Sequence, residues 1–340
     1  MEPVYVTRED LMRALDIKPS AYMRTEVDKA CRAGSRAAEG FLHRIFYPEV
    51  LTRTFDYPET GRGRGISELW FDERSLISLN TLVSDGISIP TGYTLLRPDG
   101  PPPYNRLELD RDSSAAFSGG PQRAVTITGL WGYWDMEDAR GTLTSSPSIG
   151  SGSISFSAPL DVGSIVRIGQ ERVIITERSW GASGQSGTLT GTKDASLLTV
   201  SDISAFSLGE EILLDAERME IVDMAGNALI VRRATGGSVL AAHTATPIYR
   251  STICAVQRGA LGTVASAHAA GDSAYLFLVP SLVKELALAY AEDVFLQRNA
   301  GYARTSGTGD SERIVTRTVL KGIEERAGAI YRRKVRSRAV

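Results

Sequence analysis

The sequence predicts an α+β multidomain protein, in which helices from both ends of the chain form a small α-helical bundle that carries large all-β insertions. Apolar residues recur at helical spacing within residues 1–52 and again within residues 281–340, and these two segments are predicted to form one helical core. The stretch between them breaks into short β-branched runs separated by turn residues. A chain of 340 residues also exceeds what one average core uses, so several folded units are expected.

The N-terminal segment predicts two helices. Thr7 followed by Asp10 is typical of an N-cap with an acidic residue at the third helical position. Ser20 can cap a longer helix, which Pro48 ends. The apolar and small residues of this longer helix fall on one stripe: Val27, Ala30, Cys31, Gly34, Ala38, Phe41, Leu42 and Ile45.

Residues 53–140 predict an inserted β region without a long helix, because runs such as Leu69–Phe71 and Ala124–Thr128 stand between turn signals. A glycine-rich loop in this region carries Arg62 and Arg64. These cations could contact duplex DNA in a channel or an acidic partner surface, although a solvated turn is the commoner explanation of such a loop.

Residues 141–152 are almost entirely Gly, Ser, Thr and Pro, which predicts a linker. Residues 153–280 contain two internal repeats, at shifts of 46 and 25 residues. The aligned segments are Gly163–Arg172 with Gly209–Arg218, and Val231–His243 with Val256–His268. The equivalent positions include Glu171 and Glu217, Arg233 and Arg258, Gly237 and Gly262, and His243 and His268. Such repetition predicts small duplicated β modules that stack or interlock, in which these positions have structural roles.

After Pro280 the sequence predicts a helix that ends near Asn299, and a last helix that starts at Asp310 or Ser311 and runs through Tyr331. A basic segment without acidic residues follows and contains Arg332, Arg333, Lys334, Arg336 and Arg338. Without these five residues, 33 basic residues face 40 acidic residues, a charge of -7. The C-terminal segment is therefore electrostatically distinct from the rest of the chain, either as a binding element or as a solvated helix end favoured by the helix dipole.

The sequence contains no catalytic signature, and its three histidines are His43, His243 and His268. Because the last two occupy equivalent repeat positions, a shared structural role explains them more simply than catalysis or metal binding. Glu171 and Glu217 could form the carboxylate pair of a glycosidase, but duplicated hairpin turns explain their match without chemistry. We therefore expect no enzyme, no metal site and no cofactor.

The cysteine content and the apolar runs bear on the compartment. Cys31 and Cys254 are the two cysteines, and their wide separation predicts neither a disulfide framework nor a zinc site, which fits a reducing compartment. Met1–Pro3 lacks a basic stretch leading into an apolar one, and Pro280 interrupts the longest apolar run, Ala274–Val283. We expect no signal peptide and no membrane span.

Short segments along the chain carry a family resemblance. They are the opening Val6–Leu11, the helix end Glu39–Arg44, the strand entry Thr52–Asp56, and the blocks Leu69–Asp72, Ile77–Leu82, Tyr93–Pro98, Pro103–Leu109 and Thr128–Tyr133. Together they resemble the head-to-tail connector or adaptor family of tailed bacteriophages, and Arg258–Gly271 is also similar to β modules of phage structural proteins. The insertion between Arg53 and Val279 is longer than the minimal family pattern, so the role of the repeated β region is not carried over.

The resemblance implies a structural ring subunit of the virion neck, assembled in the host cytoplasm, that links the portal protein to a head-tail stopper or tail terminator protein. It also implies a homo-oligomeric ring, a dodecamer that matches the portal, around a channel in which duplex DNA makes only nonspecific contacts. The portal-binding residues would then be Tyr331, Arg332, Arg333, Lys334, Arg336 and Arg338, in a tail that becomes ordered on binding.

A different class of protein stays open at this point: a phage tail or baseplate protein whose duplicated β region recognises a host-surface glycan. Sugar-binding surfaces use aromatic side chains as apolar platforms, whereas the repeats hold few aromatic residues apart from Trp180, Phe206 and Tyr249. An enzyme that uses Glu171 or Glu217 is the third option.

Overall fold

The computed structural model of this protein is built mainly from β-strands. Strands account for 39% of the described residues and helices for 22%. The prediction of a small helical bundle that carries β insertions is therefore wrong, because the strands form the main mass and the described part holds only four α-helices. Each of the three β units buries an apolar core of its own. The described residues are 1–15, 17, 21–57, 67–71, 74–96, 100, 102–189, 195–299, 305–306, 313–314 and 317–333.

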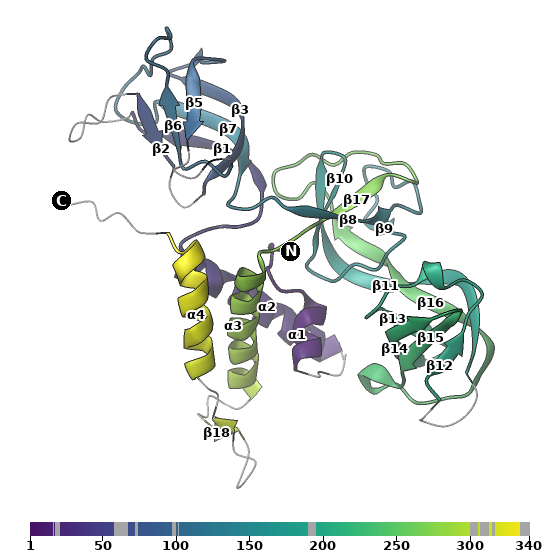
Figure 1. Ribbon diagram of the computed structural model, residues 1–340. Coiled ribbons are helices and arrows are strands. Elements are labelled where there is room, and N and C mark those ends of the chain that lie inside the picture. The colour runs from purple at the N-terminus through teal and green to yellow at the C-terminus, as the bar shows by residue number, and fades with distance from the viewer. Residues whose placement is uncertain are drawn as a thin grey trace.

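The helices are α1 (Arg8–Ala14), α2 (Ala21–Leu42), α3 (Ser281–Asn299) and α4 (Arg317–Tyr331). They lie next to one another (Figure 1) around an apolar core that includes Leu11, Val27, Leu286 and Ala327, all fully buried. The same core takes in residues of adjacent β-strands, such as Ile165 and Ile174. The helices therefore pack on β-strands as well as on one another, which is why they do not make a separate bundle.

Local sequence signals explain the first two helices. Thr7 Oγ1 accepts the N–H of Asp10 at 3.1 Å, and the Asp10 carboxylate accepts the N–H of Thr7 at 3.2 Å, which confirms the predicted cap of α1. α2 and α3 approach closely at Gly34, where a Cβ atom would lie 2.5 Å from the carbonyl oxygen of Ala287. A side chain at Gly34 would push the two helices apart.

The first β domain follows α2 and consists of two small antiparallel sheets, with strand orders β1-β7-β3-β4 and β2-β6-β5. Its strands are β1 (Glu49–Phe55), β2 (Glu68–Trp70), β3 (Leu76–Ser84), β4 (Ile87–Ser88), β5 (Tyr93–Leu96), β6 (Arg106–Leu109) and β7 (Val125–Trp131). The fully buried Trp131 packs edge-on against Phe71, with ring centroids 5.1 Å apart, and its indole N–H donates to Leu51 O at 3.1 Å. This domain therefore has a core of its own, with β1 at one sheet edge.

The repeated region forms a ten-stranded antiparallel sheet that closes into two modules. Its strands are β8 (Glu137–Thr142), β9 (Ser153–Ser155), β10 (Ile165–Ile168), β11 (Glu171–Leu189), β12 (Leu197–Thr199), β13 (Glu211–Leu214), β14 (Glu217–Ala225), β15 (Ala228–Arg232), β16 (His243–Gln257) and β17 (Ser273–Phe277). The long strands β11 and β16 pair with each other and belong to both modules. One module is inserted in the sequence between the two halves of the other, and we call them the inner and the outer module. The strands of the inner module pair in the closed order β11-β12-β15-β14-β13-β16. The outer module closes through β8-β17-β10-β11-β16-β9 and a bridge between Leu143 and Phe156.

The predicted boundaries differ from this arrangement in detail. The inserted β region was expected to end at residue 140, but β8 starts at Glu137 and pairs with β17 of the outer module. The predicted linker, residues 141–152, contains the end of β8 and the buried Leu143, so it contributes to the outer module. The start of the last predicted helix, Asp310 or Ser311, lies outside the described residues.

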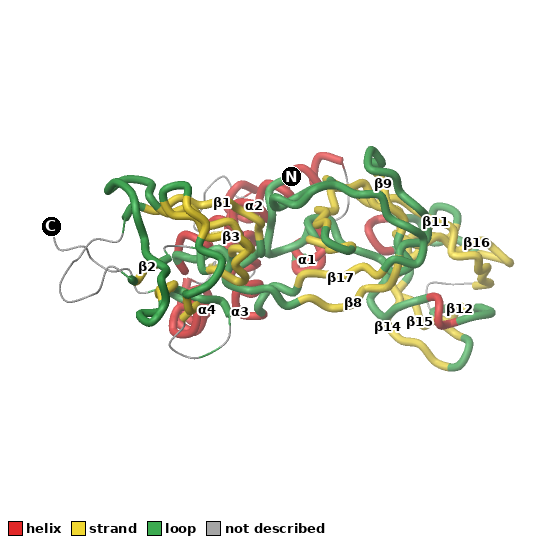
Figure 2. The backbone as a smooth tube through the Cα atoms, turned by 90° about the horizontal axis from the view of Figure 1, so that it is seen from above, coloured by secondary structure: helices red, strands yellow, loops and turns green. Residues whose placement is uncertain are grey.

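The first β domain and the inner module lie at opposite ends of the molecule, with the helices and the outer module between them (Figures 1 and 2). The remaining short elements are the 3-10 turns Ile203–Ala205 and Thr235–Gly237 and the strands β18 (Thr305–Ser306) and β19 (Arg313–Ile314). None of the described helices combines the length and apolar character that crossing a bilayer requires.

Candidate functional site

The outer module holds a buried carboxylate surrounded by hydrogen-bond donors. Arg258 donates to both oxygens of Glu171, with Nε 2.7 Å from Oε1 and Nη2 2.8 Å from Oε2. The backbone N–H groups of Gly259 and Ser266 donate to the same carboxylate at 2.9 and 3.1 Å, and His268 Nε2 lies 2.8 Å from Oε2. The side chain of Glu171 is fully buried, so its charge is balanced inside the protein.

The inner module repeats this arrangement around Glu217. Arg233 Nε lies 3.0 Å from Oε1 and Nη2 lies 2.8 Å from Oε2. The backbone N–H groups of Ala234 and Ala241 donate at 3.2 and 2.9 Å, and His243 Nε2 lies 2.9 Å from Oε2. Each donor of the outer cluster therefore has a counterpart 25 residues earlier in the sequence.

Each cluster combines the two repeats in a crossed manner. The outer cluster pairs Glu171, from the first copy of one repeat, with Arg258 from the second copy of the other. The inner cluster pairs Glu217, from the second copy, with Arg233 from the first. This crossing arises because the inner module is inserted between the two halves of the outer module. The equivalent positions predicted from the sequence are thus divided between the two modules, and each module brings together one glutamate, one arginine and one histidine.

Hydrogen bonding controls the charge of both glutamates. Burial by itself would raise the pKa of Glu171, but donation by Arg258, by two backbone N–H groups and by His268 lowers the pKa to about 2. The pKa of Glu217 is likewise lowered to about 2 by Arg233, the N–H of Ala241 and His243, against the effect of burial. Both glutamates are therefore ionised at neutral pH.

This geometry does not suit acid-base catalysis. Both oxygens of each carboxylate are occupied by donors from the protein, and Glu171 and Glu217 share none of these partners. A general acid needs a proton near neutral pH and access to substrate, and neither glutamate has both. Within the described ranges, no group of three or more His, Cys, Asp or Glu side chains is arranged to hold a metal ion. The clusters act as internal braces of the two modules.

The start of the C-terminal segment is anchored within the chain. The Tyr331 ring packs edge-on against Phe46, with centroids 5.7 Å apart, and the Tyr331 carbonyl accepts from Arg44 Nε at 2.7 Å. Arg332 stacks over the Phe41 ring, with its guanidinium carbon 5.0 Å from the centroid. These predicted portal-binding residues therefore contact α2 and the chain that follows it.

Arg333 extends this anchor to the first β domain. Its N–H donates to Leu42 O at 3.0 Å, and its Nη2 donates to Phe71 O, also at 3.0 Å. The other predicted residues of the tail, Lys334, Arg336 and Arg338, lie outside the described residues. So do Arg62 and Arg64.

Sequence reasoning missed an ionic junction between the helices and the modules. Arg8, at the start of α1, has a side chain 7% exposed and makes bidentate contacts with two acids. It reaches Asp28 of α2 at 2.7 and 2.8 Å, and Glu177 of β11 at 2.8 and 2.9 Å. A cation in the first turn of a helix opposes the helix dipole, but no local pattern in the sequence indicates which distant acidic residues it contacts.

A second arginine completes the junction. Arg178 Nε lies 3.1 Å from Glu9, and its other nitrogens lie 3.4 Å from Asp161 and 3.8 Å from Glu211 of the inner module. Burial raises the pKa of Glu9 to about 7, and the neighbouring Asp161 acts in the same direction, while Arg178 and the N–H of Val162 oppose it. The junction thus holds more carboxylates than this arginine can neutralise.

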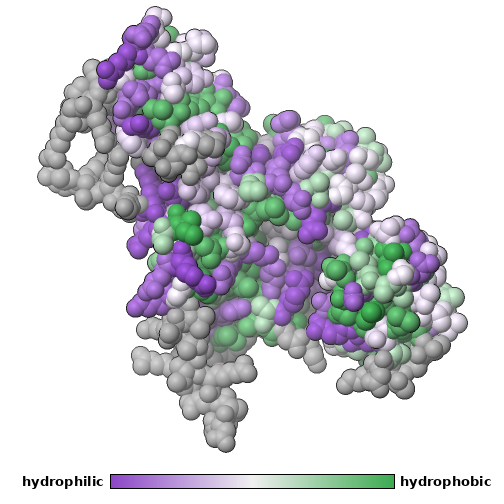
Figure 3. All heavy atoms as spheres, viewed as in Figure 1, coloured by the Kyte–Doolittle hydropathy of each residue, from purple (hydrophilic) through white to green (hydrophobic). Residues whose placement is uncertain are grey.

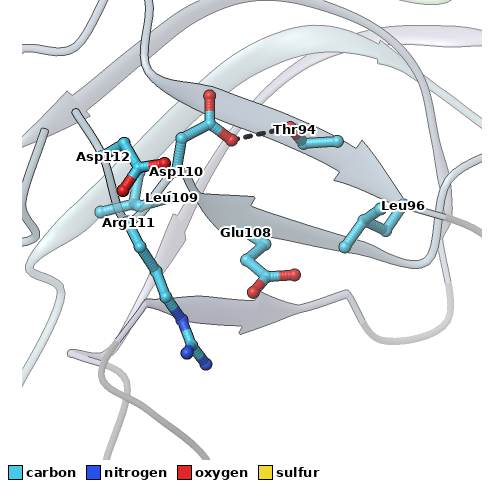
Figure 4. Close-up of a pocket in the computed structure, with 7 residues that line it drawn as sticks. All are labelled: Thr94, Leu96, Glu108, Leu109, Asp110, Arg111 and Asp112. Carbon is cyan, nitrogen blue, oxygen red and sulfur yellow. Dashed lines mark hydrogen bonds between the residues drawn. The ribbon is translucent and has the colours of Figure 1, made fainter.

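The surface hollow in Figure 4 lies on the β5-β6 side of the first β domain. It is lined by Thr94, Leu96, Glu108, Leu109, Asp110, Arg111 and Asp112. Asp110 Oδ1 accepts from Thr94 Oγ1 at 2.7 Å, and this hydrogen bond satisfies one of the acidic side chains locally.

Comparison with known proteins adds no relative to these observations. The sequence matches no protein-family model, and searches of curated proteins and of solved structures find no match.

Proposed function

We propose that this chain is a non-catalytic head-to-tail adaptor of a tailed bacteriophage, one subunit of a ring that joins the portal to the stopper or terminator of the tail. One observation carries the proposal: Arg333, the residue that directly precedes the basic residues 334–340, is held at a fixed point of the fold. Arg333 holds this point through hydrogen bonds to Leu42 and Phe71, which belong to different parts of the chain. A segment that emerges from a rigid site can dock the whole subunit on a partner.

The charge and length of the segment fit this role. Residues 334–340 include Lys334, Arg336 and Arg338, while the chain without its five C-terminal cations has a charge of -7. Seven residues reach about 25 Å when fully extended, enough to enter a groove on an adjacent ring. An acidic groove on the portal is the complementary surface.

Features of the modules support an assembly role as well. Their buried glutamates are saturated by internal donors, which fits bracing rather than chemistry. Figure 3 shows hydrophobic surface over the inner module, where Leu197, Leu208 and Val222 are each more than half exposed. Exposed apolar surface of this kind is typical of contacts between proteins.

The proposal is tested by removing residues 334–340 and measuring binding to purified portal protein. The truncation ends after Arg333 because Tyr331, Arg332 and Arg333 hold the fold together, so a longer deletion would confuse docking with folding. We expect portal binding to be lost while the melting temperature is unchanged.

A matched control separates the position of the cations from their number. Arg13, Arg232 and Arg326 have side chains that are 56%, 63% and 61% exposed. Replacing all three by alanine removes three positive charges, as many as the truncation removes. We expect the control variant to bind portal like the wild type. Equal binding by the truncated chain and the wild type would refute the proposal.

The aromatic residues of the modules do not favour the glycan-binding alternative. Phe206 is buried and lies under the guanidinium of Arg250, 5.6 Å from its ring centroid. Arg218 covers Trp180 at 5.7 Å, and Tyr249 is 38% exposed. A single exposed ring is a poor platform for sugar stacking, so we do not propose this function.

A further inference from the structure

The inner module presents an exposed copy of a loop that, in the outer module, docks onto the chain itself. We call residues 259–263 the docked loop and residues 234–238 the exposed loop; they are equivalent at the 25-residue shift. Both loops follow the arginine of a buried cluster, Arg258 in one case and Arg233 in the other. The two clusters therefore hold the two loops in the same way.

The docked loop shows that a loop of this conformation can bind the edge of a β-strand. Ala260 and Leu261 are buried at 2% and 8% exposure in the core that the helices share. The carbonyl oxygen of Leu261 accepts the N–H of Val50 in β1 at 2.9 Å. At Gly262 a Cβ atom would lie 2.0 Å from the Val50 oxygen, so only glycine allows this approach. The loop thus meets the edge of a β-strand through the backbone of Leu261 and Gly262, while the side chains of Ala260 and Leu261 enter the core.

The exposed loop has the same backbone conformation without that partner. Ala234, Gly236 and Gly237 have φ angles of 54°, 58° and 77°, and the equivalent docked positions Gly259, Leu261 and Gly262 have 58°, 54° and 73°. Gly236 and Gly237 are exposed.

Equivalent hydrogen bonds fix both loops. Ser238 Oγ donates to Thr235 O at 2.9 Å and accepts from Arg218 N at 3.0 Å. Thr263 Oγ1 makes the same pair of bonds in the docked loop: it donates to Ala260 O at 2.7 Å and accepts from Arg172 N at 2.9 Å. The exposed loop is therefore already in the shape that docks.

A receptor of the same chemistry lies on the first β domain. β1 is the edge of its sheet, and the N–H of Val50 points away from β7 toward the docked loop. Because N–H direction alternates along a strand, the N–H groups of Thr52 and Thr54 point to the same open side, and both residues are exposed. No carbonyl group in the described part of the chain pairs with these two groups. The edge therefore continues beyond the contact that the docked loop makes.

We propose that the exposed loop docks onto the β1 edge of a second copy of this chain, with the carbonyl oxygen of Gly236 accepting an N–H of Thr52 or Thr54. The inner module and the first β domain lie at opposite ends of one chain (Figures 1 and 2), so the contact forms between copies. It joins two different surfaces head to tail, and repetition of such a contact closes a ring or extends a filament. The contact involves neither the portal nor the basic tail, so it stands or fails separately from portal docking.

The experiment places a photo-crosslinking amino acid at Val239, which is 80% exposed beside the loop. Chains labelled with heavy and light nitrogen are mixed at high concentration, irradiated and digested, so that contacts between copies differ in mass from contacts within one chain. We expect crosslinks between copies from position 239 to residues 49–57. Crosslinks that join copies elsewhere, or only residues of the same chain, would overturn the proposal.

Two variants test the backbone geometry. Gly237→Ala adds a Cβ atom at the position equivalent to Gly262, and Gly226→Ala adds one at a turn with φ 59° where no atom lies within 4 Å, so both carry similar backbone strain. We expect Gly237→Ala to reduce the crosslink yield between copies by roughly tenfold or more, as expected for an unmade buried backbone pair, and Gly226→Ala to leave it unchanged.

Thr54→Pro, together with Thr52→Pro, removes the receptor N–H groups at an edge where proline is tolerated, and is expected to reduce the yield to the same extent. This second pair of changes lies in the other partner surface, so a folding defect at the loop cannot account for both results. Wild-type yield in either the loop variant or the edge variant would refute the contact.

Discussion

Replacement of Glu217 by glutamine is expected to destabilise the inner module selectively. The pKa of this carboxyl group is about 2 in the folded chain against an ordinary value of 4.5, a difference worth about 3 kcal/mol of stability at neutral pH. The amide also leaves Arg233, whose side chain is 2% exposed, without its countercharge. Removing one partner of a buried ion pair costs about 3 to 5 kcal/mol, and the variant is expected to fall in this range.

The matched control is Glu220→Gln, three residues further along β14. Glu220 pairs with Arg232, whose side chain is 63% exposed, so its loss is expected to cost less than about 1 kcal/mol. Hydrogen-deuterium exchange with mass spectrometry measures the opening free energy of peptides from each module. We expect faster exchange in residues 195–250 of Glu217→Gln and wild-type exchange in the first β domain. The reasoning is refuted if the two variants exchange alike.

The low pKa also sets a pH dependence for the wild type. Because the folded pKa of Glu217 lies below its unfolded value, the stabilisation is complete above about pH 4.5 and is lost as the pH falls toward 2. Glu171 has the same pKa and the same sign, so both modules are expected to open in the same acid range.

Three further changes test other parts of the fold. Gly34→Ala forces α2 away from α3 and is expected to lower the free energy of unfolding, measured by urea denaturation, by about 1 to 3 kcal/mol. The control Gly40→Ala, with no atom within 4 Å of the added Cβ, is expected to stabilise α2 slightly. A similar effect of both changes would contradict the close approach of the two helices. Burial raises the pKa of Glu9 to about 7, so this carboxyl group binds a proton more tightly in the folded chain than in the unfolded chain. The free energy of unfolding is therefore expected to fall as the pH rises from about 4.5 to 7. Glu9→Gln is expected to abolish this slope, and an unchanged slope would assign it to another group. Burial raises the pKa of the Cys31 and Cys254 thiols, so neither is expected to react with a disulfide reagent at pH 8 until the chain unfolds, and rapid labelling of the native chain would show that a thiol is accessible.

The repeats were the most informative signal in the sequence. They predicted that Glu171 and Glu217, and likewise His243 and His268, have shared structural roles, and the structure places each pair at equivalent points of the two modules. The crossing of the repeats was not predictable, because Arg258 meets a glutamate 87 residues away. Such a contact depends on how β11 and β16 pair, which no local pattern reveals.

The predicted fold class was wrong for a related reason. Helices carry local signals in the sequence, such as the capping residues Thr7 and Asp10, so the start of α1 was predicted. The closure of ten strands into two modules depends instead on pairings between distant segments. The terminal helices share their core with β-strands, as Ile165 of β10 and Ile174 of β11 show, and do not stand apart as a bundle. The basic segment was treated as one free tail, but Arg333 pairs with backbone groups that the sequence does not place near it.

The mass of the complex formed when the full-length chain is mixed with assembled portal protein tests the central claim most directly. If this chain is an adaptor, native mass spectrometry is expected to show a closed ring of many copies bound to the portal, absent when residues 334–340 are removed. A chain whose mass stays that of a monomer or trimer whether or not portal is present would contradict the proposed function.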